Sequence, residues 1–467
     1  MRRHSFMDAG LAGQASGEGL VGWAAALLLL LSMVLGGGGS PAPIPEIVLQ
    51  LAAAVVALGV VASPRSWQSL RSAPRLAWVI AGLIALVPVL QLIPLPSGLW
   101  QALPGRANQV AALELVDADG GWRAITLSPA RTLSSLLVAL SAGLMLVLTA
   151  ALDPRGRARL IAVLALVGAM TLLVGAAQLS GGTASALRFY DPEQIHLTGF
   201  QANHNSTADV ILIAMVAVAV PARHWLDRSG RGLPRWQLAA AAIVIDGVLV
   251  LGLFLAGSRA GLALLPVALL FQYLILRPGR GIGWTRLALS SLVAGTAAAA
   301  ALLLLRGNPA VQAVIGRFRF AGEFRPELWR DSLFALKQTW PYGSGQGTFM
   351  PQLIAVERLE VVDPTLPNRA HNDFLELALE GGLPALLVLV AIVLLLLGAF
   401  RRSLRMAGPQ VRPQVLFGGG VMVIIALHSL VDYPLRSMAL AAAAATAAGL
   451  LIPVRPKQTQ QAKGSLP

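Results

Sequence analysis

Long apolar runs recur along this chain and limit its fold more than any other feature. Of its 467 residues, 56% are hydrophobic and only 12% are charged, which is more apolar surface than a soluble domain buries. Runs of about 17–25 apolar residues cross a bilayer as helices, because a helix satisfies its own backbone hydrogen bonds. The pattern predicts an all-α, polytopic membrane helical bundle of about twelve transmembrane helices, at residues 20–36, 45–63, 76–93, 132–152, 159–179, 206–222, 235–256, 260–276, 285–305, 382–400, 414–431 and 437–454.

Two of these runs leave a smaller number of spans open, because the eighth is short and the twelfth is rich in Gly and Ala. The first run lacks a small-x-small cleavage site before the next run, so it is predicted to be a retained span. The expected organisation is an N-terminal tail over 1–19, nine spans within 20–305 with loops at 94–131 and 180–205, a large loop over 306–381, three spans within 382–454 and a C-terminal tail over 455–467.

Basic residues gather in every second loop. Alternate segments, such as those around Arg65, Arg155 and Arg401, hold most of the 36 lysines and arginines and few acids. Cytoplasmic loops carry such an excess, so both termini are predicted to be cytoplasmic and the large loop to be exported. The net charge of +14 then faces anionic lipid, and no nucleic-acid partner is needed to explain it. The absence of cysteine excludes disulfides, thiolate metal sites and cysteine nucleophiles.

The large loop is predicted to contain helices of its own, since structureless loops of that length are unusual. Residues 327–340 place Trp329, Leu333, Leu336 and Trp340 at helical spacing. This spacing predicts an amphipathic helix that lies on the membrane or over the bundle. The proline and glycines that follow at 341–347 end it.

His371, at the end of the large loop, is a candidate for proton transfer, because the pKa of an ordinary histidine lies close to neutrality. The alternative is a histidine that only hydrogen-bonds at a helix start, with Asn372 or Asp373 as the cap. Asp432 and Tyr433 follow the eleventh span, with Arg436 close enough in sequence to pair.

Arg259 stands in a tight turn between two apolar spans. Either its side chain extends to the membrane surface, or its planar guanidinium binds an anion such as a diphosphate. Arg325 is a second candidate for the same role, with Arg317, Arg319 and Arg330 nearby. Asp246 is an isolated charge within the seventh span, which makes it a functional candidate.

Residues 196–205 hold two histidines and two asparagines, but their spacing does not predict a metal site. Asn203 and Asn205 are expected either to hydrogen-bond a sugar or phosphate or to cap the sixth span.

Four motifs, in order, resemble those of the O-antigen ligase and polymerase superfamily. Residues 199–205 resemble its G-x-F-x-N-x-N stretch, and residues 258–261 resemble its S-R-x-G turn. Residues 325–349 resemble R-x-x-x-W followed by P-x-G-x-G-x-x-F, and residues 371–382 resemble H-N-x-x-L followed by E-x-G. The resemblance covers roughly residues 90–450. Pro384 stands where the family often has Gly, and this difference leaves the start of the local helix open.

The resemblance implies a GT-C-like glycosyltransferase of the bacterial inner membrane that works at the periplasmic face, takes a glycan from undecaprenyl diphosphate and requires no metal or other cofactor. His371 matches a histidine that assists the acceptor hydroxyl, and Arg259 and Arg325 match arginines that hold the donor diphosphate. The other residues expected to bind substrate are Asn203, Asn205, Arg330, Tyr342, Asn372 and Asp373.

The favoured function is polymerisation of O-antigen or exopolysaccharide repeat units. A ligase that transfers the finished glycan to the lipid A core is the close alternative. A transporter or flippase is the alternative of a different class, although the division of the spans into nine and three argues against two equal halves. A non-catalytic scaffold is the third alternative. The expected partners are the lipid-linked donor, the glycan or lipid A-core acceptor, membrane lipids and proteins of polysaccharide export or chain-length control.

Overall fold

The computed structural model of the chain describes residues 3–38, 43–190, 195–228, 235–277, 325–358 and 367–454, with isolated positions between 296 and 316 and Glu360. The described residues are helical apart from loops and two strands of two residues each, so the predicted all-α membrane bundle is confirmed. The bundle contains α1 (Arg3–Leu35), α2 (Pro43–Ala62), α3 (Pro64–Arg71), α4 (Arg75–Gln91), α7 (Pro129–Ala151), α8 (Pro154–Gly181), α9 (His204–Arg228), α10 (Arg235–Leu255), α11 (Arg259–Leu276), α16 (Asp373–Met406), α17 (Arg412–His428) and α18 (Met438–Leu451).

Six described helices are long and apolar enough to cross a membrane, and a seventh span forms if α3 and α4, which are bent by 89°, count as one. Four shorter apolar helices lie within α1, α10, α17 and α18. Every predicted span except the ninth therefore coincides with a helix. The ninth span, over 285–305, lies outside the described residues apart from isolated positions.

Helix α18 is the centre of the bundle, although its Gly/Ala-rich sequence gave the least certain span. Every residue from Met438 to Leu451 is buried except Ala441, and the helix packs against α7, α17 and α1. Small side chains allow neighbouring helix backbones to approach closely in a membrane. A Cβ atom at Gly449 would lie only 2.7 Å from Cβ of Thr149 in α7. The small residues of this segment thus serve close helix packing.

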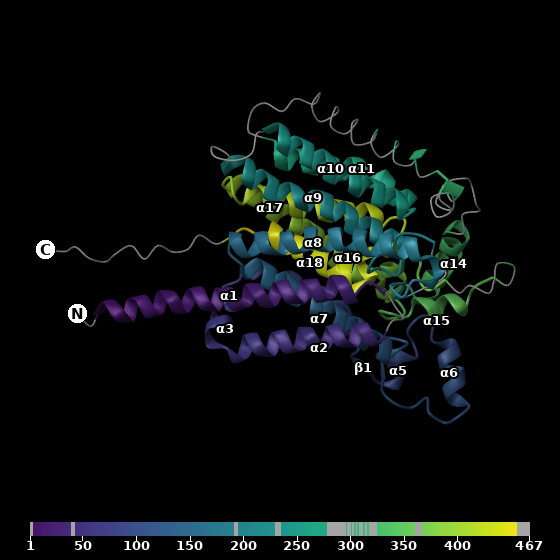
Figure 1. The fold of residues 1–467 in the computed structure, drawn as a ribbon. Coiled ribbons are helices and arrows are strands. Elements are labelled where there is room, and N and C mark those ends of the chain that lie inside the picture. Colours follow the sequence, from purple (N-terminus) through teal and green to yellow (C-terminus); the bar gives the residue numbers. More distant parts are fainter. Residues whose placement is uncertain are drawn as a thin grey trace.

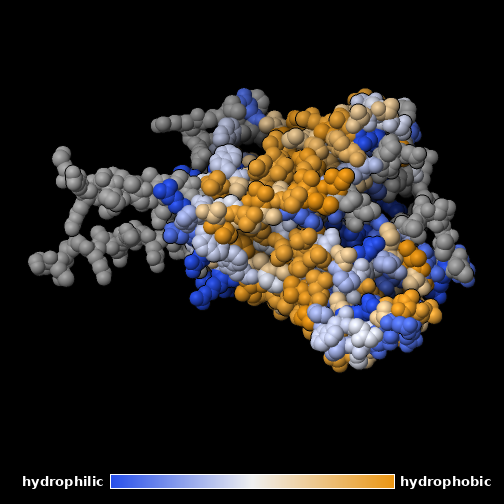
Figure 2. All heavy atoms as spheres, turned by 90° about the horizontal axis from the view of Figure 1, so that it is seen from below, coloured by the Kyte–Doolittle hydropathy of each residue, from blue (hydrophilic) through white to orange (hydrophobic). Residues whose placement is uncertain are grey.

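Apolar side chains cover the middle of the face of the bundle that Figure 2 shows, with polar groups at both of its ends. Large apolar side chains on α2 and α16 are exposed there, among them Val55, Leu58, Leu387 and Leu394, which are 61–68% exposed. A soluble protein would hide such side chains, whereas in a membrane they contact lipid.

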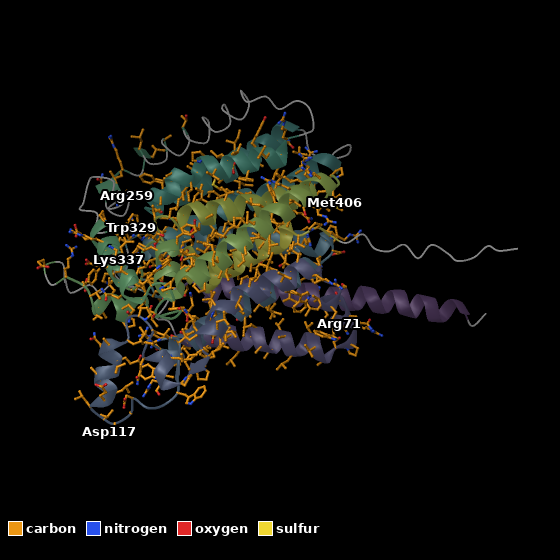
Figure 3. All side chains as sticks on the ribbon, turned by 180° about the vertical axis from the view of Figure 1, so that it is seen from behind. Arg71, Asp117, Arg259, Trp329, Lys337 and Met406 are labelled. Carbon is orange, nitrogen blue, oxygen red and sulfur yellow. The ribbon has the colours of Figure 1, made fainter. Side chains whose placement is uncertain are left out.

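The two ends of the bundle differ in structure. Helices α5 (Ser97–Trp100), α6 (Ala107–Glu114), α14 (Arg325–Thr339) and α15 (Phe349–Ile354) gather at one end, and α1 begins at the other (Figure 1). Strands β1 (Pro94–Leu95) and β2 (Arg123–Ala124) pair antiparallel near α5, with Pro94 opposite Ala124. Asp117, Arg259 and Trp329 lie at the end with the loop helices, whereas Arg71 and Met406 lie at the opposite end (Figure 3). We call the first of these the loop end.

Helix α14 coincides with the helix predicted in the large loop. Its buried residues are Leu328, Asp331, Ser332, Ala335 and Thr339. Leu333 and Trp340, on the predicted apolar face, are 49% and 41% exposed, so this face does not pack against the bundle, and its contact with the membrane stays a prediction. The buried face is selected by contact with the start of α16, where small and polar side chains fit more closely than large apolar ones.

Helix α16 is broken at Gly382, and this break reconciles its early start with the predicted span. The helix begins at Asp373, but Gly382 has φ of 59° and ψ of −155°, which are not helical angles. The predicted span starts at this break, and Pro384 lies in the first turn beyond it, a position that proline tolerates. Pro384 is therefore compatible with this helix start.

The glycine-rich segment after α14 satisfies the backbone groups that the break exposes. The N–H groups of Ser344 and Gly345 donate to the carbonyls of Leu379 and Glu380 at 3.1 and 2.8 Å. Gly343 has φ of 78°, and a Cβ atom there would lie 2.4 Å from the carbonyl oxygen of Glu380. Only glycine permits this approach, which explains the spacing of glycines in the motif.

At the end opposite the loop end, Arg157 joins three helices through their carbonyl groups. Its guanidinium donates to the carbonyls of Ala150, Leu152 and Ile452 at 3.1, 3.2 and 2.9 Å, while the residue is 1% exposed. The last carbonyls of a helix have no partner within the helix. Arg157 therefore supplies the hydrogen bonds that the ends of α7 and α18 lack.

We expect Arg157→Met to lower the free energy of unfolding by about 2–4 kcal/mol, because several buried carbonyls lose their donor. Arg155→Met is the matched control, since Arg155 lies exposed in the same helical turn, and its effect should stay within about 0.5 kcal/mol. Thermal unfolding in detergent, followed by fluorescence of the 10 tryptophans, measures both. Equal effects of the two substitutions would contradict this role.

Candidate functional site

His371 stands directly before α16, and its neighbours fix its position. The Asn372 side chain caps the helix by accepting from the N–H groups of Phe374 and Leu375, both at 3.0 Å. The backbone of His371 has φ of 49°, a left-handed conformation that non-glycine residues rarely adopt. Such strain persists only where surrounding contacts impose it, and it is frequent at functional sites.

Contacts on both sides of residue 370 impose this conformation. The N–H of Ala370 donates to the carboxylate of Glu376 at 3.0 Å, and its carbonyl accepts from the indole N–H of Trp329 at 2.8 Å. Helix α14 thus holds the loop from one side and α16 from the other. The sequence motif that contains Trp329 serves to orient His371.

The imidazole of His371 pairs with the buried carboxylate of Asp432. Nδ1 of His371 lies 2.9 Å from Oδ1 of Asp432, and the two side chains are 16% and 3% exposed. Burial alone raises the pKa of Asp432, but the hydrogen bond and charge of His371, together with the charge of His428, bring that pKa below its ordinary value. Asp432 is therefore a carboxylate, and the Nδ1 atom that faces it must carry the proton.

Tyr433 packs its ring against His371, with the ring centroids 4.9 Å apart and an interplanar angle of 71°. Burial, followed by the charge of Asp432, raises the pKa of the Tyr433 phenol. The phenol therefore stays neutral, and its apolar ring packs beside the imidazole.

Asn203 and Asn205 reach the same carboxylate from the start of α9. The amide nitrogen of Asn203 donates to Oδ2 of Asp432 at 3.2 Å, and its carbonyl oxygen accepts from the N–H of Asn205 at 2.8 Å. A hydrogen bond from Asn205 also favours the charged form of Asp432. Asn203 therefore both caps α9 and orients the partner of His371, while sugar or phosphate binding by the two asparagines stays a prediction.

A cluster of buried charges lies under the start of α16. Arg436, in the 3-10 turn η3 (Pro434–Arg436), pairs with Glu380 at 2.7 Å, Glu376 at 3.3 Å and Asp373 at 3.6 Å. Burial opposes its charge, but the three carboxylates raise the pKa of Arg436 above its ordinary value. Arg369 adds a second cation, 2.8 Å from Glu376. We call these five side chains the Arg436 cluster.

The expectation that Arg436 pairs with Asp432 is wrong, because the chain turns back after Tyr433 and directs Arg436 toward α16 instead. Asp373, which was expected to bind substrate, belongs to the Arg436 cluster and also accepts from the hydroxyl of Ser429 at 2.8 Å. The side-chain oxygen of Asn372 caps α16, and its side-chain nitrogen donates to the carbonyl of Leu430 at 3.1 Å. Contact of these two residues with substrate stays a prediction.

The arginines expected to bind the diphosphate lie at the loop end, in elements that adjoin the His371 site. Arg325 begins α14, and its charge interacts with that of His428, next to Asp432. Arg330 is exposed one turn further along this helix. Trp329 of the same helix lies at the loop end (Figure 3) and donates to the carbonyl of Ala370, so the structure brings α14 next to His371.

Arg259 is the exposed first residue of α11, and Ser258 caps that helix by accepting from the N–H of Gly261 at 3.0 Å. Its turn packs on the segment before α9, since a Cβ atom at Gly257 would lie 3.0 Å from His196. The N–H of Leu197 also donates to the carbonyl of Leu255 at 3.1 Å. Arg259 and Asn203 therefore belong to neighbouring segments, and Asn203 in turn contacts the partner of His371.

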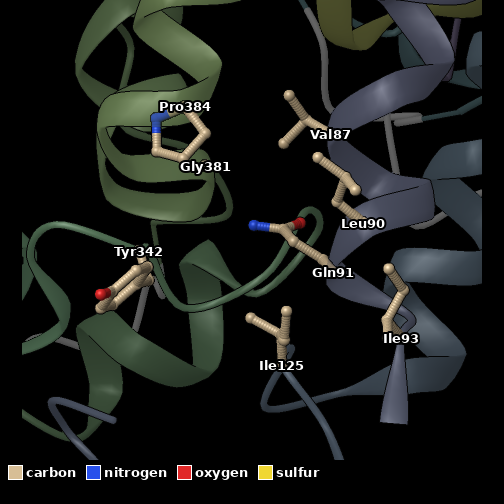
Figure 4. Close-up of a pocket in the computed structure, with 8 residues that line it drawn as sticks. All are labelled: Val87, Leu90, Gln91, Ile93, Ile125, Tyr342, Gly381 and Pro384. Atoms are coloured by element: carbon tan, nitrogen blue, oxygen red, sulfur yellow. The ribbon is translucent and has the colours of Figure 1, made fainter. Parts of the chain in front are cut away.

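Tyr342 lies elsewhere, at a cavity between α4 and α16 (Figure 4). The cavity measures about 190 Å³, and its lining is mostly apolar, with Val87, Leu90, Gln91, Ile93, Ile125, Tyr342, Gly381 and Pro384. A helix rises about 1.5 Å per residue, so Gly381 lies roughly 12 Å along α16 from its first residue. This cavity is therefore not the place where His371 acts.

The described residues contain no group of three or more histidine, aspartate or glutamate side chains arranged to hold a metal ion. The closely spaced carboxylates of α16 are already engaged by Arg369 and Arg436. Asp246 accepts from the amide of Gln272 at 2.8 Å, so this intramembrane charge pairs α10 with α11. Arg317 and Arg319 lie outside the described residues.

Sequence reasoning missed the Arg436 cluster and the buried pair of Asp209 and His428. A signal for the first was present, since acids at positions 373, 376 and 380 share one helix face and apolar residues follow. Asp209 and His428 gave a weaker signal, namely single polar residues inside apolar helices, which in membranes are mostly paired.

Comparison with known families agrees with these motifs. Residues 241–390 match the family model described as O-antigen ligase. The matched range contains Arg259, Arg325 and His371, while Asn203 and Asp432 lie outside it. No curated protein matches the sequence. Its motifs, its all-helical membrane bundle and this match over 150 residues support the resemblance of the chain to the O-antigen ligase and polymerase superfamily.

Proposed function

We propose that the protein transfers a glycan from undecaprenyl diphosphate to an acceptor hydroxyl at the periplasmic face of the bacterial inner membrane, and that it polymerises O-antigen or exopolysaccharide repeat units. The observation that carries this proposal is the pair of His371 and Asp432, whose imidazole is partly exposed and stands beside α14, one of the loop-end helices of the membrane bundle. A base at this place is accessible to an acceptor hydroxyl that arrives from water and to a lipid-linked donor that arrives from the membrane.

The proposed acceptor of the hydroxyl proton is Nε2 of His371. The geometry supports this role: because Nδ1 donates to the carboxylate of Asp432, Nε2 is the unprotonated ring nitrogen. As the acceptor oxygen attacks the anomeric carbon, Nε2 takes its proton, and Asp432 stabilises the imidazolium that forms. The bond between the anomeric carbon and the diphosphate oxygen breaks, and its electron pair leaves with undecaprenyl diphosphate.

Arginines supply the second requirement, which is to stabilise negative charge on the departing diphosphate. Guanidinium groups bind phosphate oxygens in a bidentate manner and stay charged at any physiological pH. Arg259 and Arg325 stand at the loop end and extend from helix starts rather than from long loops. Helix starts place a side chain with little conformational freedom, which favours a preorganised site.

The topology completes the proposal. Both termini are proposed to be cytoplasmic, and the loop end to be periplasmic, as the distribution of basic residues predicts. The apolar cavity between α4 and α16 lies where the lipid-facing apolar side chains meet the loop end, and we propose that it receives part of the prenyl chain. Gln91 closes its inner side through hydrogen bonds to the carbonyl of Glu380 and the N–H of Gln346.

A ligase that transfers the glycan to the lipid A core is the second candidate, and the description of the matching family favours it. Both reactions use the same donor and the same base, so the site chemistry does not separate them. The difference lies in the acceptor.

We expect His371→Gln to lower the rate of glycan transfer by about 100-fold or more, and Asp432→Asn by about 10–100-fold, because the base or its orienting carboxylate is lost. The assay measures release of undecaprenyl diphosphate from a lipid-diphosphate glycan by purified protein in detergent. No gradient exists there, so a transporter would release nothing. His224→Gln is the matched control, since His224 contacts only the carbonyl of Gln410. Unchanged turnover in His371→Gln would refute the assignment.

We expect Arg259→Lys and Arg325→Lys each to lower kcat/KM for the donor by about tenfold, because lysine cannot bind a diphosphate in a bidentate manner. Replacement by Gln should lower it by about 100-fold, since the charge is lost as well. The same release assay at several donor concentrations measures these effects, with Arg155→Lys as the control. If kcat/KM for the donor in both Lys variants equalled that of the native protein, this result would argue against diphosphate binding by these arginines.

Deletion of the gene should leave single repeat units on the acceptor lipid if the protein is a polymerase. A ligase deletion should instead leave long chains on the undecaprenyl carrier, because polymerisation continues without transfer. Gel electrophoresis of the lipid A-core fraction and of the carrier-linked fraction measures the two outcomes. Long chains on the carrier would replace the polymerase proposal with the ligase.

A further inference from the structure

A second pair of histidine and carboxylate lies beneath the first. Nδ1 of His428, at the end of α17, stands 2.7 Å from Oδ1 of Asp209 in α9, and both side chains are at most 1% exposed. The other ring nitrogen of His428 and the other oxygen of Asp209 have no hydrogen-bond partner. Unsatisfied buried polar atoms destabilise a fold. This pair is therefore poorly explained by stability alone.

The two pairs form a series of alternating charges that runs from the core to the surface: Asp209, His428, Asp432 and His371. His428 and Asp432 are one helical turn apart, and the N–H of Asp432 donates to the carbonyl of His428 at 2.9 Å. The charge of His428 acts on Asp432, and the charge of Asp432 acts on Asp209. The series thus contains one imidazole between two carboxylates.

The charged groups that face His428 come from three elements. Asp209 belongs to α9, Asp432 to the turn after α17, and Arg325 to α14. Burial of the ring is the largest influence and opposes an imidazolium at this position, as does the charge of Arg325, whereas the two carboxylates favour it. Of these three groups, Asp209 is hydrogen-bonded to the ring, with Nδ1 of His428 2.7 Å from its Oδ1.

We propose that His428 and Asp209 are positioning residues, in which the imidazolium of His428, held by Asp209, keeps Asp432 ionised and so keeps His371 in the tautomer whose Nε2 is unprotonated. The part that concerns His371 as a base rests on the proposed function. If Asp432 gained a proton, Nδ1 of His371 would lose its acceptor, and the ring would be free to adopt the other tautomer. A fixed positive charge behind Asp432 prevents this.

The first test measures the ionisation of Asp432 itself. In protein labelled with ¹³C at the aspartate side chains, the Asp432 carboxyl resonance is identified by its absence from Asp432→Asn and is followed from acid to neutral pH. Removal of a neighbouring positive charge favours the protonated carboxyl. We therefore expect the titration midpoint of Asp432 to rise by about one pH unit in His428→Gln.

A double variant separates charge from packing. His428→Gln with Asp209→Asn removes a cation and an anion together, so the titration of Asp432 should return most of the way to that of the native protein. If the pair were purely structural, the titration midpoint of Asp432 in the double variant would differ from that of the native protein at least as much as it does in His428→Gln. Thr446→Val is the matched control, because Thr446 is equally buried and bonds only within its own helix.

The transfer assay gives the second readout. The acid limb of its pH profile should move toward neutral pH in His428→Gln, and it should move back in the double variant. If His428→Gln does not fold, His428→Asn is used instead, since it removes the same positive charge and should shift Asp432 in the same direction. An Asp432 titration unchanged in both single variants would overturn this proposal. Lack of transfer by the native protein would instead refute the proposed function, because the titration needs no substrate.

Discussion

The ion pairs of Arg436 with three carboxylates of α16 hold the site together. Charges that are buried in a membrane protein must be paired, so Arg436 binds the start of α16 firmly to the segment that follows α17. That segment carries Asp432 and Tyr433, and the start of α16 carries His371. The cluster therefore fixes the two halves of the acid–base pair relative to each other, although 61 residues separate them in sequence. Loss of Arg436 would leave buried carboxylates without a counter-charge and would release both halves together.

The break in α16 lets one helix serve two environments. Its first turns lie beside a buried polar cluster and begin with a cap next to the candidate base, while its later turns present leucines and valines to lipid. An unbroken helix would continue in one direction from site to membrane. The break at Gly382 permits a change of direction there, and the segment after α14 supplies donors to the exposed carbonyls. The glycine-rich motif is thus a structural support of the site.

Local patterns predicted the helices, and they gave caps at Asn203 and Asn372 as alternatives, because hydropathy and capping depend on neighbouring residues. Pairing across the bundle was not predictable in this way. Asn203 reaches Asp432 over 229 residues, and Arg436 turns to α16 instead of to its neighbour in sequence. The buried face of α14 was not predictable either, since a polar face can be buried when its partner is itself a polar cluster. The His371 motif pointed to the right loop, whereas the identity of its partner required the fold.

The arrangement of charge is consistent with the proposed role of His371 as a base close to a membrane. A single carboxylate behind an imidazole would gain a proton readily if it were desolvated, and its orienting effect would be lost. Here Asp432 is almost completely buried, yet it receives hydrogen bonds from His371 and Asn203 and lies one helical turn from His428. These neighbours hold the pKa of Asp432 below its ordinary value, so burial excludes water without neutralising the carboxylate. A site of this kind stays preorganised at the boundary between lipid and water, where solvent would otherwise compete for every hydrogen bond.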